Sequence, residues 1–222
     1  MKETTLYLEN QEINIEQKIY FKFKRIFDIV IGIIGLIFLL PLAMFIKINY
    51  LLDGDKESII YKQERIGQNG KTFTIFKFRT MIPNAEKELV KILKKNKKLA
   101  KEYEINHKLE NDPRITKVGK MIRKVSLDEF PQMFNVLLGH MSIIGNRPYL
   151  PREKVDMDEY YDEIVKTKPG ITGYWQVSGR SSTTFEKRLE LESYYSNNFS
   201  FLLDFKIFLK TFSTVLFKKG AK

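Results

Sequence analysis

The stretch SLDEFPQMFN, residues 126–135, places two carboxylates side by side, Asp128 and Glu129. Adjacent carboxylates can supply a nucleophile, a general base or oxygen ligands for a hard cation such as Mg²⁺. A simpler interpretation is a solvated helix start, with Ser126 as the N-cap and Glu129 at the third helical position. These residues alone leave both interpretations open.

Basic residues precede this acidic pair, and the whole chain carries a formal net charge of +11. The nearest are Lys117, Lys120, Arg123 and Lys124. Such an excess indicates an anionic partner, for which nucleic acid, phosphorylated metabolites and anionic lipid headgroups all qualify. Composition does not choose among these three classes.

The cysteine and histidine content limits the chemistry. The chain has no cysteine, which excludes disulfides and thiolate metal sites, and it has two isolated histidines, His107 and His140. A histidine-built metal site or a serine triad is therefore not expected, and we interpret His140 as structural. The length of 222 residues allows one catalytic domain with an appendage.

An uncharged apolar run covers residues 29–46, and its roughly 18 residues would rise about 27 Å as a helix, close to the thickness of a bilayer core. Pro41 lies inside the run, where its ring opposes the carbonyl of Ile37, so a break is expected there. Both flanks are basic, which favours the cytoplasmic side for both ends. We predict a re-entrant membrane helix over 22–50, broken at Pro41, and keep a spanning helix as the alternative.

The predicted helix divides the chain into an N-terminal extension, residues 1–21, and a cytosolic catalytic domain, residues 51–222. Early in that domain, two strands joined at Asn69-Gly70 form a predicted hairpin, because both turn residues accept positive φ. Lys77 and Arg79 share one face of the second strand by period two. The sequence GQNGKT at the turn lacks the spacing of a phosphate-binding P-loop.

Three later segments complete the pattern. Residues 85–109 predict a solvated amphipathic helix. The loop TKPGITGYWQVSGRSS carries glycines, an aromatic residue and Arg180, a combination common at ligand sites. The C-terminal FSFLLDFKIFLKTFSTVLFKKG predicts an amphipathic segment at the membrane interface or in the core.

Several motifs in order resemble the bacterial sugar transferase family, the monotopic phosphoglycosyl transferases. They are KRIFD before the apolar run, YKQERIGQNGKTF, KFRTM, NDPRITKVGK, SLDEFPQMFNVLLGHMSIIGNRP and KPGITGYWQVSGR. The resemblance covers the chain from about residue 22 to its end. It implies an α/β-type enzyme, mostly helical with a small β-hairpin or sheet, with amphipathic interfacial helices.

The resemblance also implies an activity: transfer of a sugar 1-phosphate from a UDP-sugar to undecaprenyl phosphate, releasing UMP, with Mg²⁺ as cofactor. It implies that Asp128 and Glu129 are the catalytic dyad and metal ligands, and that Arg123 and Arg147 bind phosphate. The segment usually reading Pro-Arg-Pro is Asn146-Arg147-Pro148 here. Lys77, Arg79 and Arg180 are further candidates for substrate binding.

The expected location is the bacterial inner membrane, with the catalytic domain on its cytoplasmic face. Expected partners are the UDP-sugar, undecaprenyl phosphate, membrane lipids and a second copy of the chain, but no nucleic acid. The alternative function is a basic, membrane-anchored binding protein without turnover. Against nucleic acid as its ligand, most phenylalanines lie in apolar runs rather than between basic residues. A multi-pass component would need further long apolar spans.

Overall fold

The computed structural model describes residues 15–106, 109–179 and 183–216. It divides into two compact units. Unit 1 comprises Met1–Leu36, Glu64–Thr74 and Gln132–Lys222, and unit 2 comprises Ile37–Gln63 and Ile75–Pro131. Residues of the predicted catalytic domain 51–222 therefore contribute to both units.

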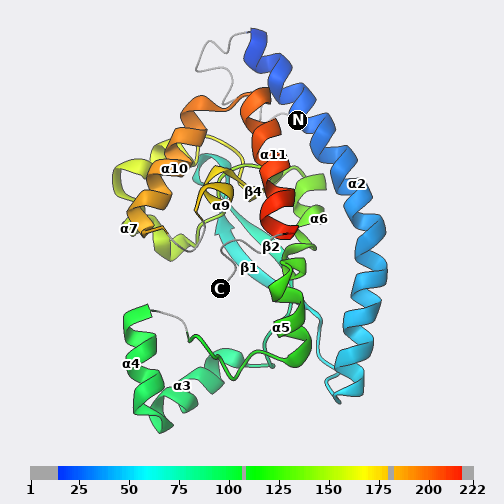
Figure 1. The fold of residues 1–222 in the computed structure, drawn as a ribbon, viewed down its shortest axis with the longest axis vertical. Helices are drawn as coiled ribbons and strands as arrows, with labels where there is room; N and C mark the ends of the chain where they lie inside the picture. Colours follow the sequence, from blue (N-terminus) through cyan, green and yellow to red (C-terminus); the bar gives the residue numbers. More distant parts are fainter. Residues whose placement is uncertain (1–14, 107–108, 180–182, 217–222) are drawn as a thin grey trace. The chain divides into compact units, whose positions relative to one another are not determined.

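The described residues are mostly helical with little sheet, which confirms the predicted fold class (Figure 1). The elements are α2 (Ile15–Leu52), β1 (Ile60–Ile66), β2 (Thr72–Phe78), α3 (Ala85–Lys95), α4 (Lys97–Asn106), α5 (Lys117–Lys124), α6 (Gln132–Leu137), β3 (Ser142–Ile144), α7 (Lys154–Met157), α8 (Tyr161–Ile164), β4 (Gly170–Thr172), α9 (Tyr174–Ser178), α10 (Phe185–Asn198) and α11 (Phe201–Leu216).

Helix α2 contains the apolar run and continues through Pro41. The break predicted there is not confirmed, because helical structure is assigned on both sides of the proline without an interruption. Among the described residues, α2 alone is long and apolar enough to cross a membrane. Many of its large apolar side chains are exposed, including Ile33, Ile37 and Leu40.

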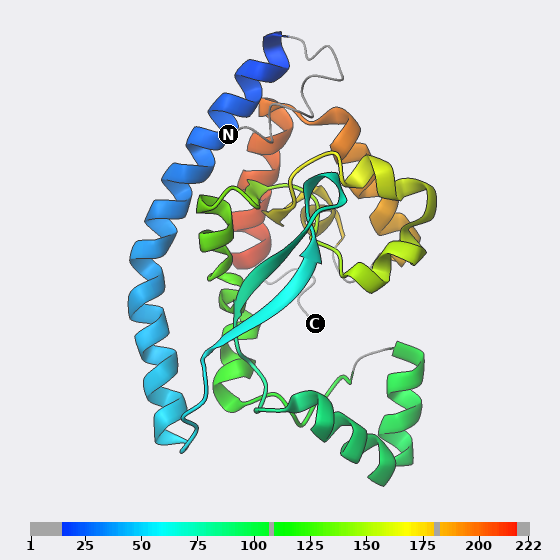
Figure 2. The ribbon, with the colours of Figure 1, turned by 180° about the vertical axis from the view of Figure 1, so that it is seen from behind.

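Strands β1 and β2 pair as the predicted hairpin (Figure 2). Asn69 and Gly70 have φ of 60° and 73°, so the left-handed turn expected from Asn-Gly is confirmed. Strand β2 ends at Phe78. Arg79 therefore follows the strand, while Lys77 lies within it.

Unit 1 surrounds the short parallel pair β3–β4, in which Ser142 pairs with Gly170 and Ile144 with Thr172. Helices α10 and α11 lie beside α9, and α11 also contacts β3 and β4 (Figure 1). The first part of α2 packs closely on α6, because a Cβ on Gly32 would lie 2.8 Å from the Leu137 side chain.

Unit 2 contains the helices α3, α4 and α5. The single amphipathic helix expected over 85–109 is instead two helices, because Asn96 leaves helical geometry at φ −129° and its side chain accepts hydrogen bonds from the Lys98 and Leu99 N–H groups. Helix α5 begins after Thr116, whose Oγ1 caps it by accepting from the Gly119 N–H at 2.9 Å.

Candidate active site

The dyad lies in unit 2, in the short 3₁₀ turn Leu127–Glu129 between α5 and α6. The N-cap expected from Ser126 is not present: its side chain makes no capping hydrogen bond, and its backbone is left-handed at φ 57°. A non-glycine residue in this conformation carries strain, and such residues are concentrated at functional sites. The local backbone therefore favours a functional interpretation of the dyad over a simple helix start.

The two carboxylates have different partners. Glu129 Oε1 accepts a hydrogen bond from Lys77 Nζ at 2.7 Å, and the two side chains form an ion pair. Asp128 makes no ion pair with a side chain among the described residues. Burial raises the pKa of Asp128, and the adjacent Glu129 raises it further, while Lys77 and Arg123 oppose the shift. Asp128 is thus the less engaged carboxylate of the pair.

Arg123 lies near the end of α5, five residues before Asp128, and its side chain is exposed. Its Nε donates to Thr80 Oγ1 at 2.8 Å. That bond fixes one edge of the planar guanidinium of Arg123. Among the described residues, no other group accepts a hydrogen bond from this guanidinium. Two donors on the opposite edge can therefore meet a phosphate.

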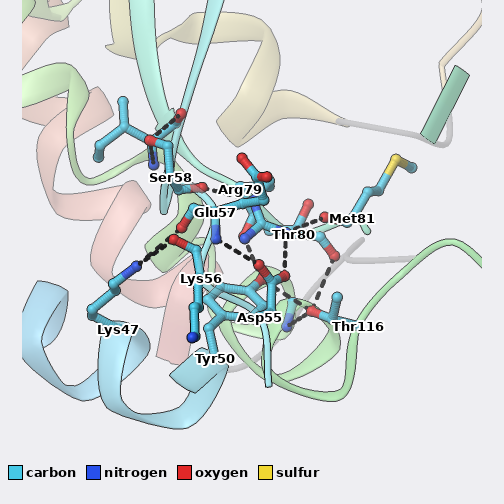
Figure 3. Close-up of polar contacts among 12 residues, drawn as sticks. Lys47, Tyr50, Asp55, Lys56, Glu57, Ser58, Arg79, Thr80, Met81 and Thr116 are labelled. Atoms are coloured by element: carbon cyan, nitrogen blue, oxygen red, sulfur yellow. Dashed lines mark hydrogen bonds and ion pairs between the residues drawn. The ribbon is translucent and has the colours of Figure 1, made fainter. Parts of the chain in front are cut away.

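Arg79, a candidate for substrate binding, makes several contacts within the protein (Figure 3). Its guanidinium forms an ion pair with Asp55 at 2.9 Å and stacks 4.5 Å from the centroid of the Tyr50 ring. Its Nε donates to the Ser58 carbonyl at 2.7 Å and its Nη1 to the Met81 carbonyl at 3.0 Å. Substrate binding by Arg79 stays a prediction, and these contacts give it a structural task.

Burial alone would raise the pKa of Asp55. Hydrogen bonds from Arg79 and from the Glu57 N–H outweigh burial and leave the pKa below its ordinary value. Asp55 is therefore held as a carboxylate. No local sequence pattern predicts this pair, because strands β1 and β2 separate its two members along the chain.

Arg147 lies in unit 1, whereas the dyad lies in unit 2. Its backbone N–H donates to both carboxylate oxygens of Glu192, each at 3.2 Å. Glu192 is 1% exposed, and burial raises its pKa to about 8 against the opposing effect of Arg147. No sequence motif pointed to Glu192, whose carboxylate accepts the Arg147 N–H and so anchors the Asn146-Arg147-Pro148 turn. Arg180 lies outside the described residues.

The two dyad carboxylates fit magnesium in one particular form. Mg²⁺ is usually bound by one or two carboxylates together with waters and substrate phosphates. The residues that the structure describes include no group of three or more His, Cys, Asp or Glu side chains that could hold a metal. We therefore expect water or a bound phosphate to supply the remaining ligands of any Mg²⁺ at the dyad.

Replacing Asp128 should reveal the cost of burying its charge. Because its pKa is raised by folding, the native state binds the proton more tightly than the unfolded chain does. The free energy of unfolding therefore falls as pH rises above the ordinary aspartate value. We expect Asp128→Asn to melt at a higher temperature than the wild type at about pH 7, with the difference shrinking towards about pH 3.

Thermal denaturation of the two proteins in the same detergent measures this difference. Asp53→Asn, which neutralises an exposed carboxylate of the same unit, is the matched control. A lower melting temperature for Asp128→Asn at neutral pH would contradict the assigned burial cost.

Most of the chain matches a known protein family. A family model described as bacterial sugar transferase matches residues 19–218. The chain belongs to the bacterial sugar transferase family. The resemblance carried by the sequence motifs is thereby confirmed.

Curated relatives of this bacterial sugar transferase have related names. An exopolysaccharide production protein ExoY from Sinorhizobium fredii is 38% identical over 218 residues, which cover 98% of this chain and 96% of that relative. An uncharacterized sugar transferase from Haemophilus influenzae is 43% identical over 89% of this chain, which spans 42% of its length. An undecaprenyl-phosphate galactose phosphotransferase from Salmonella typhimurium is 42% identical over 89% of this chain and 41% of its own length.

Proposed function

We propose that the chain transfers a sugar 1-phosphate from a UDP-sugar to undecaprenyl phosphate, giving undecaprenyl-diphosphate-sugar and UMP. This would be the first membrane step in the synthesis of a surface glycan such as a capsule, exopolysaccharide, O-antigen or glycoprotein glycan. The names of the relatives support it, since they include the galactose phosphotransferase above and a UDP-glucose:undecaprenyl-phosphate glucose-1-phosphate transferase from Klebsiella pneumoniae.

The observation that carries the mechanism is the asymmetry of the dyad. Glu129 is paired with Lys77 at 2.7 Å, whereas Asp128 is half-buried without an ion pair among the described residues. A nucleophile needs an oxygen free to approach phosphorus. We therefore assign Asp128 as the nucleophile and Glu129 as the base or metal ligand.

The transfer takes place in two balanced steps. A carboxylate oxygen of Asp128 forms a bond to the phosphorus that carries the sugar, the bond from this phosphorus to the bridging oxygen breaks, and UMP leaves with that oxygen and its electron pair. A phosphate oxygen of undecaprenyl phosphate then attacks the same phosphorus. The bond to Asp128 breaks, and the carboxylate is regenerated.

The cations assigned to substrate binding match the negative charge of the substrate. Arg123 presents one edge of its guanidinium, and Arg147 is assigned to phosphate by its family motif. Lys77 holds Glu129 in place by direct pairing. Magnesium, when bound with the diphosphate, would neutralise part of its charge.

An assay of UMP release tests this function. Purified protein with Mg²⁺ and undecaprenyl phosphate is offered a panel of UDP-sugars, and UMP is measured together with the lipid product. We expect one or a few donors to give equal amounts of both. Absence of UMP with every donor, from protein shown to be folded, would contradict the proposal and favour the binding protein without turnover.

We also propose that α2 enters and leaves the membrane on one face, with the catalytic residues at the cytoplasmic side of the bacterial inner membrane. Before the apolar run, Lys24 pairs with Asp204 at 2.5 Å, and after it Tyr50 Oη donates to the Arg79 carbonyl at 2.6 Å. Both ends are thus held by chain that follows the run. With no second candidate span among the described residues, this packing supports one face for both ends.

Cysteine labelling tests this topology, because the natural chain has no cysteine. Lys18→Cys and Glu57→Cys introduce one thiol at an exposed position on each side of the run. We expect an impermeant maleimide to label neither in intact spheroplasts and both after lysis. Labelling of Lys18→Cys alone in intact spheroplasts would establish a spanning helix instead.

A further inference from the structure

We propose that Tyr50, at the C-terminal end of the membrane helix α2, is a positioning residue that orients Arg123 for catalysis. This inference rests on the proposed function. Tyr50 and Arg123 belong to the same unit and are joined through two threonines, Thr116 and Thr80. The end of the membrane element would then be part of the framework of the active site.

The hydroxyl of Tyr50 joins a strand end to a helix start (Figure 3). Its Oη lies 2.6 Å from the Arg79 carbonyl and 3.0 Å from Thr116 Oγ1. Because a carbonyl only accepts, Tyr50 must give its proton to Arg79. The Thr116 hydroxyl has one proton, and its contact with Tyr50 at 3.0 Å is shorter than its contact with the Thr80 carbonyl at 3.4 Å. We therefore assign Thr116 as the donor to Tyr50, which gives a directed chain of two hydrogen bonds.

Thr116 holds α5 against the end of β2. Its Oγ1 also accepts from the Gly119 N–H, and its own N–H donates to the Thr80 carbonyl at 3.0 Å. Gly119 permits this approach, since a Cβ there would lie 2.0 Å from the Thr80 carbonyl oxygen. The position of α5 is therefore fixed at its first turn.

Arg123 lies in the last turn of α5, so its place depends on how the helix is seated. It follows Thr116 by about two helical turns and so lies on the same side of the helix. Its Nε donates to the side-chain oxygen of Thr80. The backbone carbonyl of the same Thr80 accepts the hydrogen bond from the Thr116 N–H. A shift at Tyr50 would therefore change the placement of the Arg123 guanidinium.

The side chain of Arg79 also contacts Tyr50. It stacks on the Tyr50 ring and pairs with Asp55, while Lys47 Nζ donates to the Lys56 and Glu57 carbonyls at 3.1 Å. The ring of Tyr50 is 1% exposed. Removing only the hydroxyl leaves this stacking in place, so Tyr50→Phe is a narrow probe of the hydrogen-bond chain.

The first test compares Tyr50→Phe with Tyr61→Phe, which removes a hydroxyl from a 43% exposed tyrosine of the same unit. We expect Tyr50→Phe to lower kcat for UMP release about ten- to a hundredfold per folded molecule, with a smaller change in KM for the UDP-sugar. Tyr61→Phe should retain wild-type kcat. Wild-type kcat in Tyr50→Phe would overturn the inference.

The second test asks whether Tyr50 acts through Arg123. Arg123→Lys keeps the charge and loses the planar fork, so adding Tyr50→Phe to it should cost far less than in the wild-type background. Equal losses in both backgrounds would overturn the inference. Thr116→Ser, which keeps the bridging hydroxyl, should retain most activity, whereas Thr116→Val, which also removes the N-cap of α5, should lose at least as much as Tyr50→Phe.

Hydrogen exchange provides a measurement that needs no substrate. Amides of residues 117–124 should exchange faster in Tyr50→Phe than in the wild type or Tyr61→Phe. If the wild type releases no UMP, the proposed function fails whatever the exchange shows. If it does release UMP and neither exchange nor kcat responds to Tyr50→Phe, only the positioning role fails.

Discussion

Asp128→Asn enzyme given a UDP-sugar and Mg²⁺, without lipid acceptor, should release no UMP and gain no mass. The wild type under the same conditions should release up to one UMP per site and gain the mass of a sugar phosphate, because the acyl phosphate forms before the acceptor is needed. The substitution removes the nucleophilic oxygen at nearly constant size. Rapid-quench measurement of UMP and intact-protein mass spectrometry follow the two products.

Glu129→Gln is the matched control, since it changes the neighbouring carboxylate in the same way. It should slow turnover while still allowing some adduct, which should map to the peptide containing SLDEF. An adduct on Glu129 would reverse the assignment within the dyad. UMP release that strictly requires the lipid, with no labelled protein at any time, would indicate direct transfer in a ternary complex.

Gly119→Ala should destabilise the protein, although alanine favours helices over glycine by about 1 kcal/mol. The new Cβ would lie 2.0 Å from the Thr80 carbonyl oxygen, a backbone atom that cannot rotate away. Overpacking of this kind costs about 1 to 3 kcal/mol. The displacement of α5 should also lower UMP release, since Arg123 moves with it.

Lys120→Ala, at the next and exposed position of α5, is the control for this change. Denaturant unfolding should show a lower midpoint for Gly119→Ala than for the wild type, and little change for Lys120→Ala. A stabilised Gly119→Ala protein would show that α5 is not seated against Thr80.

Features encoded by adjacent residues could be predicted from the sequence. The hairpin turn at Asn69-Gly70 is such a feature, because it needs only two residues that accept positive φ. The family motifs likewise located the dyad as candidate catalytic residues, a role that stays a prediction. The division of the amphipathic segment at Asn96 was missed, although asparagine is a known capping residue.

Features that depend on distant partners could not be predicted. Tyr50 donates to the carbonyl of Arg79, which lies 29 residues further along the chain. Lys77, which opposes the rise in the pKa of Asp128, comes from β2. Period two placed Lys77 and Arg79 on one face of the second strand, but β2 ends at Phe78, before Arg79. The pattern also gives no information on which of the two meets a carboxylate of the dyad. Only the folded arrangement separates Lys77 beside Glu129 from Arg79 beside Asp55.

The ion pair between Lys24 and Asp204 also has a consequence for the order of biosynthesis, because 180 residues separate its members. At about 5 to 20 residues per second, the ribosome needs roughly 10 to 40 s to deliver Asp204 after Lys24 has emerged. During that interval α2 has none of its α11 contacts. We expect the lipid bilayer to cover the apolar side chains of α2 during this interval. The membrane would then stabilise the nascent chain before the residues that pack on α2 have been synthesised.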